Sequence, residues 1–385
     1  MWHYLKFLAY NITILIGVST LFLADFYILL GFIIFVGCYV AGDALLGNDL
    51  SQPTLNNKRV LNILLYSSVP TTLALLVSVL WLTSAGNWAV MEWVSTQLHY
   101  DFYQSKLNTN YYELFVAVLF SGLMLSGVAT VVGHELVHKV GNKKAVTVGR
   151  WLMATSIDAN FSIEHLFGHH INVATAKDPA TAPRGRNVYI HVIYAIFLTN
   201  YSAWKIEEKR LTRKNISVWS THNQCIRGWL MTLVWASVFF AVSGVLGLLF
   251  FFAMAFVSKA ILEVVNYMEH YGLVRDPRQR VEPRHSWNSN KKISCWAMFN
   301  LPRHSHHHAK GAVPFEKLES MPDAPVMISG YIATLGLTLI PPLWFKLMKP
   351  KLEHWDRHYA NATELEILNQ RNDQSGKKFN TTSLV

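Results

Sequence analysis

Long apolar runs are the feature of this chain that most restricts how it can fold. Runs of about 20 residues, the length that an α-helix needs to cross a bilayer, recur between residues 7 and 265. Only 15% of the residues are charged, against about 25% in soluble domains. The sequence therefore predicts an all-α, polytopic membrane protein.

Six membrane spans are predicted from these runs, at about 7–24, 26–43, 60–83, 112–133, 229–244 and 247–265. The first two should form a tight hairpin around Asp25. As one helix, residues 229–265 would be about 55 Å long at 1.5 Å per residue. That length exceeds a hydrocarbon core of about 30 Å. We therefore expect a break at Ser243, Gly244 and Gly247.

The basic residues predict the orientation of the spans. The connection 84–111 carries one basic residue, Lys106, whereas 134–227 and 266–385 are rich in Lys and Arg. The positive-inside rule then places these basic segments and both termini in the cytoplasm. The net charge of +10 follows from this retention signal and would also attract an acidic electron donor. Because the basic residues are spread through loops, nucleic-acid binding is not indicated.

The remaining segments complete the predicted organisation. An apolar stretch at 325–347, interrupted by Pro341 and Pro342, is expected to dip into or pack against the cytoplasmic side. Residues 1–365 form one membrane domain, and 366–385 form a polar tail that we expect to be disordered. Cys38, Cys225 and Cys295 are isolated, which excludes a fused iron–sulfur module with four cysteine ligands.

Four histidine clusters carry the chemistry. They contain ten of the 17 histidines and read HELVH at 134–138, EHLFGHH at 164–170, NYMEHYG at 266–272 and LPRHSHHH at 301–308. Imidazole is a ligand that suits iron, zinc and copper, and a mononuclear catalytic zinc needs only three protein ligands. Ten candidates argue for two metal ions, and histidine donors beside membrane helices point to iron and oxygen chemistry.

The spacing within the clusters predicts shared helix faces. His134 and His138 are four residues apart, as are His165 and His169, and His304 and His308. HELVH alone is also a zinc-protease signature, with Glu135 as the general base, but a five-residue match is weak.

Acidic residues adjoin three of the clusters. We expect Glu135, Glu164 and Glu269 to hold the second ring nitrogen of metal-bound histidines. Direct ligation by these carboxylates is the less favoured alternative, and simple charge balance in a cationic region is another.

The four motifs resemble those of the alkane 1-monooxygenase family, membrane-bound non-haem di-iron hydroxylases that also include xylene and cymene methyl-group monooxygenases. The segments 178–180 and 285–290 resemble the family as well, and the likeness covers about residues 40–360. Segment 341–359 looks closer to the xylene branch, whereas the second and fourth motifs look closer to the alkane branch. Pro302 and His306 stand where the family has glutamine and aspartate. The resemblance implies nine metal ligands, His134, His138, His165, His169, His170, His270, His304, His307 and His308, and leaves His306 as a supporting or surface residue.

The resemblance also implies an activity. Two iron ions and O2 would hydroxylate the terminal methyl group of an apolar substrate in a bacterial inner membrane. A medium-chain n-alkane is the favoured substrate and an alkyl-aromatic methyl group the alternative. A fatty-acyl desaturase or lipid hydroxylase, a membrane zinc protease and a metal transporter are less favoured. Because the chain has no G-x-G-x-x-G dinucleotide fingerprint, a separate rubredoxin or ferredoxin-type iron–sulfur reductase would supply the electrons.

Overall fold

The computed structural model describes residues 2–374, which are helical throughout apart from loops and two isolated β-bridges. The N-terminal half contains α1 Trp2–Leu5, α2 Leu8–Leu23, α3 Tyr27–Leu46, α4 Lys58–Tyr66, α5 Ser68–Thr83, α6 Ala89–Leu98, α7 Phe102–Asn108, α8 Tyr111–Leu125, η1 Ser126–Val131, α9 Val132–His138, α10 Lys143–Ala154, α11 Phe161–Glu164, η2 His165–His169 and α12 His170–Asn172. The C-terminal half contains α13 Val188–Thr212, α14 Gln224–His270, η3 Pro283–His285, α15 Lys292–Ala297, α16 His304–Ala309, η4 Phe315–Lys317, α17 Tyr331–Thr338, α18 Pro341–His358 and α19 Ala362–Gln374. The expected all-α class is confirmed.

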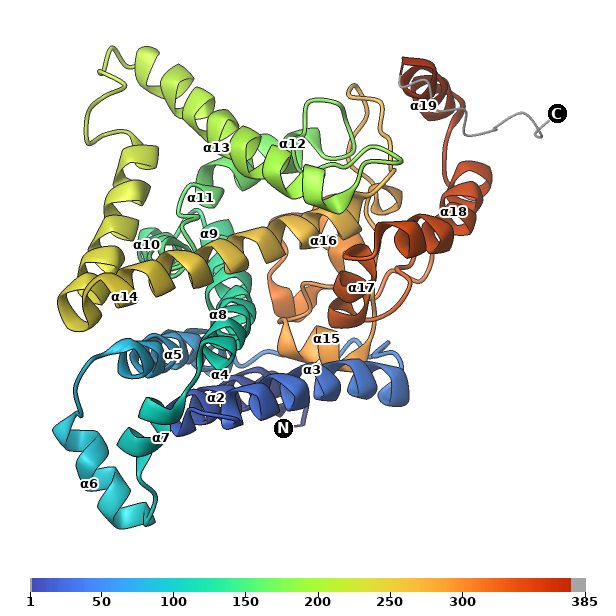
Figure 1. The fold of residues 1–385 in the computed structure, drawn as a ribbon. Coiled ribbons are helices and arrows are strands. Elements are labelled where there is room, and N and C mark those ends of the chain that lie inside the picture. The colour runs from blue at the N-terminus through green and yellow to red at the C-terminus, as the bar shows by residue number, and fades with distance from the viewer. Residues whose placement is uncertain (1, 375–385) are drawn as a thin grey trace.

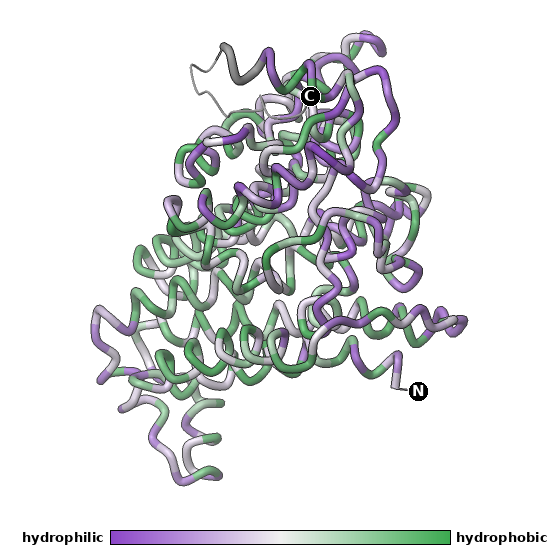
Figure 2. The backbone as a smooth tube through the Cα atoms, turned by 90° about the vertical axis from the view of Figure 1, so that its right-hand side faces the viewer, coloured by the Kyte–Doolittle hydropathy of each residue, from purple (hydrophilic) through white to green (hydrophobic). Residues whose placement is uncertain are grey.

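The apolar helices form one bundle whose core joins α2, α3, α5, α8 and α14 (Figure 1). Hydrophobic backbone segments dominate this bundle, and hydrophilic segments gather beyond one end of it (Figure 2). A second core surrounds the C-terminal end of α14 and the helices α17, α18 and α19. The histidine motifs lie where these two parts meet.

Each predicted span corresponds to helix, but the count of six is not confirmed. Within residues 2–374, four helices are long and apolar enough to cross a membrane, at Tyr27–Leu46, Lys58–Thr83, Tyr111–His138 and Gln224–His270, or five if the bent pair α17 and α18 counts as one. Helix α2 has only 16 residues, about 24 Å at 1.5 Å per residue. The two predicted C-terminal spans correspond to the two legs of α14, which meet at a kink at Gly244.

The predicted breaks occur where the sequence places them. The α2–α3 hairpin turns through Ala24 and Asp25, both with positive φ. Within α14, Gly244 has φ 60° and ψ −150°, a conformation that suits glycine because it has no Cβ. The two legs of α14 diverge sharply at this point (Figure 1). Helices α17 and α18 are bent by 118° immediately before Pro341.

The C-terminal tail differs from the prediction of disorder. Helix α19 extends to Gln374, so the first residues of the predicted disordered tail are helical, and residues 375–385 lie outside the described part. Asn361 caps this helix reciprocally with Glu364, at 2.9 and 3.0 Å. Leu368 is buried in the second core. A cap and one buried apolar position therefore order a segment whose composition is polar.

Candidate metal centre

The first histidine pair stands at the end of a membrane-length helix. His134 and His138 lie on α9, which continues α8 through the π-helical turn η1 at Ser126–Val131. π-Helical turns are rare and are frequent at functional sites. The pair shares one helix face, with ring centroids 4.7 Å apart, as the spacing predicts.

The second motif departs from the predicted i, i+4 pairing because it is π-helical. Residues His165–His169 form η2, whose wider turn brings His165 beside His170 rather than His169. The Nε2 atoms of His165 and His170 are 3.0 Å apart. Gly168, the glycine of this motif, packs closely against the Glu164 side chain. A Cβ atom at this position would lie only 2.5 Å from Oε1 of Glu164.

The remaining ligand candidates come from two further elements. His270 is the last residue of α14, and His304, His307 and His308 lie on the short helix α16. His307 and His308 follow His304 by three and four residues, but their rings belong to different groups. His308 stays with His304, whereas His307 turns toward His170, with their Nε2 atoms 3.1 Å apart.

The nine histidines therefore form two groups. Within each group, all ligand atoms lie within 4.8 Å of one another. The five-histidine group consists of His134, His138, His165, His170 and His307. The four-histidine group consists of His169, His270, His304 and His308. The tenth motif histidine, His306, belongs to neither.

The convergence of the ring nitrogens fits metal ions at both positions. In the five-histidine group the Nε2 atom of His165 lies 2.9 Å from that of His134 and 3.1 Å from that of His138. In the four-histidine group the corresponding distance is 3.2 Å both for the pair His169–His308 and for the pair His304–His270. Nitrogens bound to one ion at about 2.0–2.1 Å lie about 3 Å apart. All-imidazole donors suit zinc, copper, iron and nickel.

The charge state of these rings supports ligation. Burial, and then the neighbouring histidines, hold the pKa values of five rings outside the spans well below the usual range. These are His165, His170, His304, His307 and His308. The neutral imidazole is the form that binds a metal ion. These five rings are therefore ready to coordinate without first losing a proton.

Asp178 orients one ring and was not predicted as a site residue. Its Oδ2 accepts a hydrogen bond from Nδ1 of His169 at 2.9 Å, and both side chains are buried. The Thr181 hydroxyl donates to the same oxygen at 2.6 Å. Burial alone would lower the pKa of His169, but Asp178 outweighs it and raises that pKa to about 9. The only sequence signal was the resemblance of segment 178–180, because nine residues separate Asp178 from His169.

Glu269 is the one predicted glutamate that contacts a histidine. Its Oε2 lies 3.1 Å from Nε2 of His304, and its Oε1 accepts a hydrogen bond from the Tyr331 hydroxyl at 2.6 Å. Nε2 of His304 is also the atom that faces His270. Glu269 therefore approaches from the side on which the ring nitrogens converge, rather than from behind the ring.

Glu135 and Glu164 lie close to the groups but, within residues 2–374, neither forms a hydrogen bond or ion pair with a histidine. Glu135 pairs weakly with Lys139 at 3.8 Å. Oε1 of Glu164 is buried and has no hydrogen-bond partner among the described atoms. Burial, and then the Asp178 carboxylate, raise the pKa of Glu164 to about 8.

His306 is buried rather than a surface residue. It is 1% exposed, and its Nδ1 accepts a hydrogen bond from the backbone N–H of Glu319 at 2.8 Å. The contact ties α16 to the loop that follows η4. His306 therefore supports the ligand-bearing helix from the side away from both groups.

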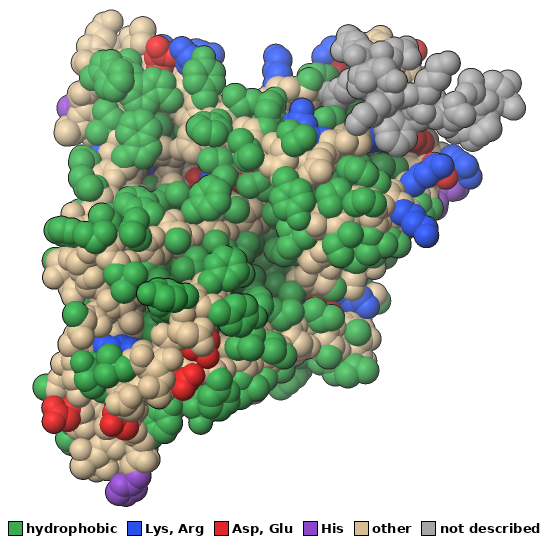
Figure 3. Space-filling model, in the orientation of Figure 1, with side chains coloured by type: hydrophobic (Ala, Val, Ile, Leu, Met, Phe, Trp, Pro, Cys, Tyr) green, Lys and Arg blue, Asp and Glu red, His purple; other side chains and the backbone are tan. Residues whose placement is uncertain are grey.

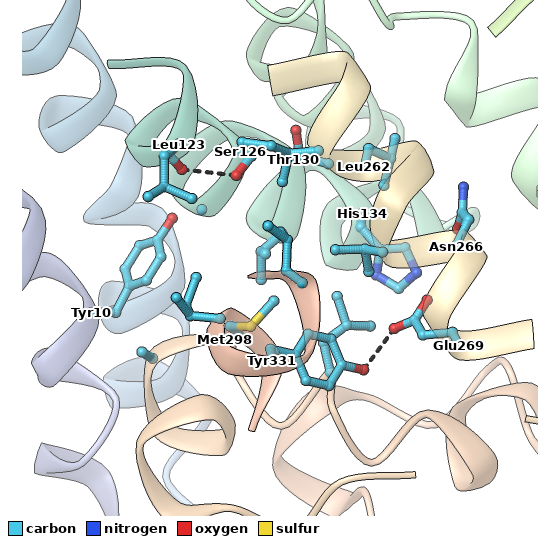
Figure 4. Close-up of a pocket in the computed structure, with 18 of the residues that line it drawn as sticks. Tyr10, Leu123, Ser126, Thr130, His134, Leu262, Asn266, Glu269, Met298 and Tyr331 are labelled. Carbon is cyan, nitrogen blue, oxygen red and sulfur yellow. Dashed lines mark hydrogen bonds between the residues drawn. The ribbon is translucent and has the colours of Figure 1, made fainter. Parts of the chain in front are cut away.

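An apolar cavity of about 80 Å³ adjoins both groups. His134, His165, His304 and Glu269 line it together with apolar side chains of the bundle. In Figure 4, Tyr10 lies at one end and His134 and Glu269 lie at the other. The polar centre thus opens onto a space lined by α2, α3, α8, η1, α14 and α17.

Comparison with known proteins agrees with this site. Residues 112–324, which include all four motifs, match the fatty acid desaturase family model. Alkane 1-monooxygenase 1 of Pseudomonas aeruginosa is 37% identical over 262 residues, 67% of each chain. Alkane 1-monooxygenase of Ectopseudomonas oleovorans is 32% identical over 357 residues, 89% of this chain and 82% of that protein. The hydroxylase component of xylene/toluene monooxygenase from Pseudomonas putida is 36% identical over 258 residues, 66% of this chain and 68% of that protein.

The match thus extends beyond the motifs into the membrane bundle, and relatives named as alkane monooxygenases cover most of the chain. This membrane protein, with its paired histidine groups and its apolar cavity, is a member of the alkane 1-monooxygenase family of O2-dependent hydroxylases.

Proposed function

We propose that the protein hydroxylates the terminal methyl group of an apolar substrate, using O2 and two electrons from a separate carrier. A medium-chain n-alkane, converted to the primary alcohol, is the substrate we favour, and a methyl group on an aromatic ring is the alternative. The observation that carries the proposal is the apolar cavity whose inner end is lined by His134, His165 and Glu269.

Two iron ions are the cofactor that we propose. The five-histidine and four-histidine groups would each hold one ion, and imidazole ligands suit iron. Iron would supply the activation of O2 that no amino-acid side chain can provide. Glu135, Glu164 and Glu269 are the predicted supporting carboxylates, and the contacts of Asp178 and Glu269 make these two the strongest candidates.

The protein's own contribution is orientation and exclusion of water. Apolar side chains such as Leu123, Leu262 and Met298 line the cavity (Figure 4). An apolar substrate would partition into the bilayer and enter this space from there. A narrow apolar channel would present the chain end to the histidine groups, so that the terminal methyl reacts in preference to weaker internal C–H bonds.

The electrons must come from outside the described chain. Its cysteines, Cys38, Cys225 and Cys295, are not paired, and the sequence has no dinucleotide fingerprint. We propose a rubredoxin or a ferredoxin-type iron–sulfur reductase as the donor. It would meet the protein on the cytoplasmic face of a bacterial inner membrane, where the positive-inside rule puts the basic segments. An acidic donor would then associate faster at low salt.

Three other activities are less well supported. A fatty-acyl desaturase or lipid hydroxylase would share the matched family model, but the curated relatives cited above are monooxygenases that act on hydrocarbons by name. A zinc protease would use His134, Glu135 and His138 alone, which would leave the other seven grouped histidines unexplained. A metal transporter would place its ligands near the middle of the spans, whereas His138 and His270 end theirs.

The test is a product assay on purified protein reconstituted in lipid with iron, a reduced carrier and O2. We expect octane to give 1-octanol and xylene to give the benzylic alcohol more slowly. Omitting the carrier should abolish product when NADH is the only reductant. Formation of an alkene from an acyl chain, or full activity with one zinc ion per chain, would contradict the proposal.

A further inference from the structure

A large basic groove lies apart from the substrate cavity. Its volume is about 1040 Å³, and its walls come from the end of α9, from α10 and α11, from the C-terminal part of α13 and from the start of α14. It shares no lining residue with the cavity. Its use is therefore not explained by the proposed hydroxylation.

The groove carries a strong excess of positive charge. Seven basic side chains line it, against one acidic side chain, Glu207. The basic residues are Lys143, Arg150, Lys209, Arg210, Arg213, Lys214 and Arg227. Arg210 binds the Glu207 carboxylate at 2.6 and 2.7 Å, and the backbone N–H of Gln224 donates to it at 2.7 Å. The Glu207 carboxylate, the one acidic group in the groove lining, therefore already has hydrogen-bond partners within the protein.

Most of the remaining cations have no protein counterion. Lys143, Lys209, Arg213, Lys214 and Arg227 are exposed, and none forms an ion pair within the described range of 2–374. Like charges so close together repel one another unless an anion lies between them.

Arg150 is a buried cation in the lining of the same groove. Its side chain is 6% exposed, and its two terminal nitrogens hold the side chain and backbone of Gln224 at 2.8 and 2.6 Å. Its Nε is buried without a partner among the described atoms. Burying an unpaired cationic donor is unfavourable, so a bound anion would compensate it.

Apolar side chains make up most of the remaining lining, beside Thr147, Ser162 and Gln224. Val137, Val140, Ile163, Leu166, Phe167 and Ile206 contribute to the walls. Val140 is 60% and Phe167 is 54% exposed. Cationic and apolar side chains thus share one concave surface, which matches an amphipathic ligand with an anionic head.

The groove lies at a membrane boundary. Two candidate spans end there, Tyr111–His138 at its C-terminus and Gln224–His270 at its N-terminus. Trp219 and Trp229, which flank the start of α14, are largely exposed, and such tryptophans are typical of the bilayer interface. Viewed as in Figure 3, the molecule is covered mainly by hydrophobic side chains, with its charged side chains toward the upper and lower ends.

We propose that this groove binds an anionic phospholipid. The phosphate would lie among Lys209, Arg213 and Lys214, and an acyl chain would lie along the apolar wall. A lipid is favoured over an acidic protein because the apolar residues line a hollow beside two span ends, where lipid is always present. Basic residues at this depth are attracted to anionic headgroups. The inference does not depend on which metal or substrate the protein uses.

The position of the groove gives the lipid a structural consequence. Val137 precedes His138, and Ile163 and Leu166 flank the pair Glu164–His165. A bound lipid would therefore pack against the two helical segments that carry part of the five-histidine group. It should raise the thermal stability of the folded protein.

The experiment compares nanodiscs of phosphatidylcholine alone with nanodiscs of equal parts phosphatidylcholine and phosphatidylglycerol. The test variant is Lys209→Gln/Arg213→Gln/Lys214→Gln. The matched control is Lys346→Gln/Lys349→Gln/Arg357→Gln, three exposed cations of α18. The readouts are the thermal unfolding temperature and the phosphatidylglycerol that remains bound after detergent extraction, measured by native mass spectrometry.

We expect wild type and control to unfold at a higher temperature in the anionic nanodiscs and to retain phosphatidylglycerol. The test variant should lose about tenfold or more in bound phosphatidylglycerol and most of the temperature shift. In phosphatidylcholine alone it should unfold with the wild type, which shows that it folds. Inorganic phosphate added to neutral nanodiscs should not reproduce the shift, because it lacks the acyl chains.

Equal retention of phosphatidylglycerol by the test variant and the wild type would overturn the proposal. So would a shift produced fully by inorganic phosphate, which would indicate a simple anion site. The proposal also fails if the test variant keeps its lipid response but loses binding of an acidic rubredoxin. That result would make the groove a protein-docking surface.

Discussion

The two histidine groups differ in how they are enclosed. In the four-histidine group every ring is buried, whereas His138 and His170 of the five-histidine group are partly exposed. Carboxylates contact the four-histidine group through Asp178 on His169 and Glu269 on His304. Within residues 2–374, no carboxylate lies within ion-pair distance of a ring in the five-histidine group.

This difference indicates unequal roles for the two positions. A cation surrounded by protein needs anionic partners to offset the loss of its hydration, and Asp178 and Glu269 supply them for the four-histidine group. The five-histidine group relies on a larger number of neutral rings and contributes two rings, His134 and His165, to the cavity, whereas the four-histidine group contributes only the ring of His304. We infer a firmly held ion in the four-histidine group and a more accessible ion in the five-histidine group.

Removing one ring from each group should have the largest effect. We expect His169→Ala and His165→Ala each to lower bound iron from about two ions to about one per chain. Each should lower turnover by more than the 10–100-fold that loss of a supporting residue typically costs. Elemental analysis and product assay measure the two effects. His306→Ala is the matched control from the same motifs and should keep its iron. Equal iron loss in all three variants would contradict the division into two groups.

Removing the carboxylate behind His169 should have the next largest effect. Asp178→Asn keeps the size and shape of the side chain but weakens the hydrogen bond that it accepts from Nδ1 of His169. We expect about 10–100-fold lower activity. Glu135→Gln should change activity by less than about fivefold, because its contact with Lys139 at 3.8 Å resembles a weak surface pair. The two variants are compared by turnover at saturating carrier. A larger loss in Glu135→Gln would reverse our ranking of the supporting carboxylates.

Glu269→Gln distinguishes a supporting carboxylate from a ligand. We expect about 10–100-fold lower activity with most of the iron retained, since the four rings of the group remain. Tyr331→Phe removes the hydrogen bond to Oε1 of Glu269 and should cause a smaller loss. Complete loss of iron from the four-histidine group in Glu269→Gln would instead identify this residue as a direct ligand.

The far end of the cavity should tune the substrate preference of the more accessible group. Tyr10→Ala would lengthen the space opposite His134 (Figure 4). We expect the ratio of kcat/KM for a longer to a shorter n-alkane to rise about tenfold, within the range for one or more methylenes in an apolar pocket. Tyr112→Ala, at an exposed tyrosine outside the cavity, is the control. No change in the ratio would show that the substrate does not reach Tyr10.

Local pattern in the sequence was enough to predict the bundle helices and the histidines of the site. Apolar runs must be buried or face lipid as helices, because only a helix satisfies its own backbone in a membrane. The breaks at Asp25, Gly244 and Pro341 follow from local backbone preferences. The helix α13 was missed because polar residues such as His191, Thr199 and Asn200 interrupt its uncharged part and its charged residues begin at Lys205, so that no membrane-length apolar run marks it.

The sequence alone determined which residue types meet at the site, because four motifs with ten histidines can be recognised without a fold. Only the tertiary structure decided how those rings divide. The π-turn at His165–His169 places His165 beside His170 and sends His169 to Asp178 and His308, although the spacing suggests that His165 and His169 share a face. A hydrogen-bond register of i to i+5 and contacts between residues over a hundred positions apart depend on the packing of the whole bundle. They cannot be read from the spacing within any one motif.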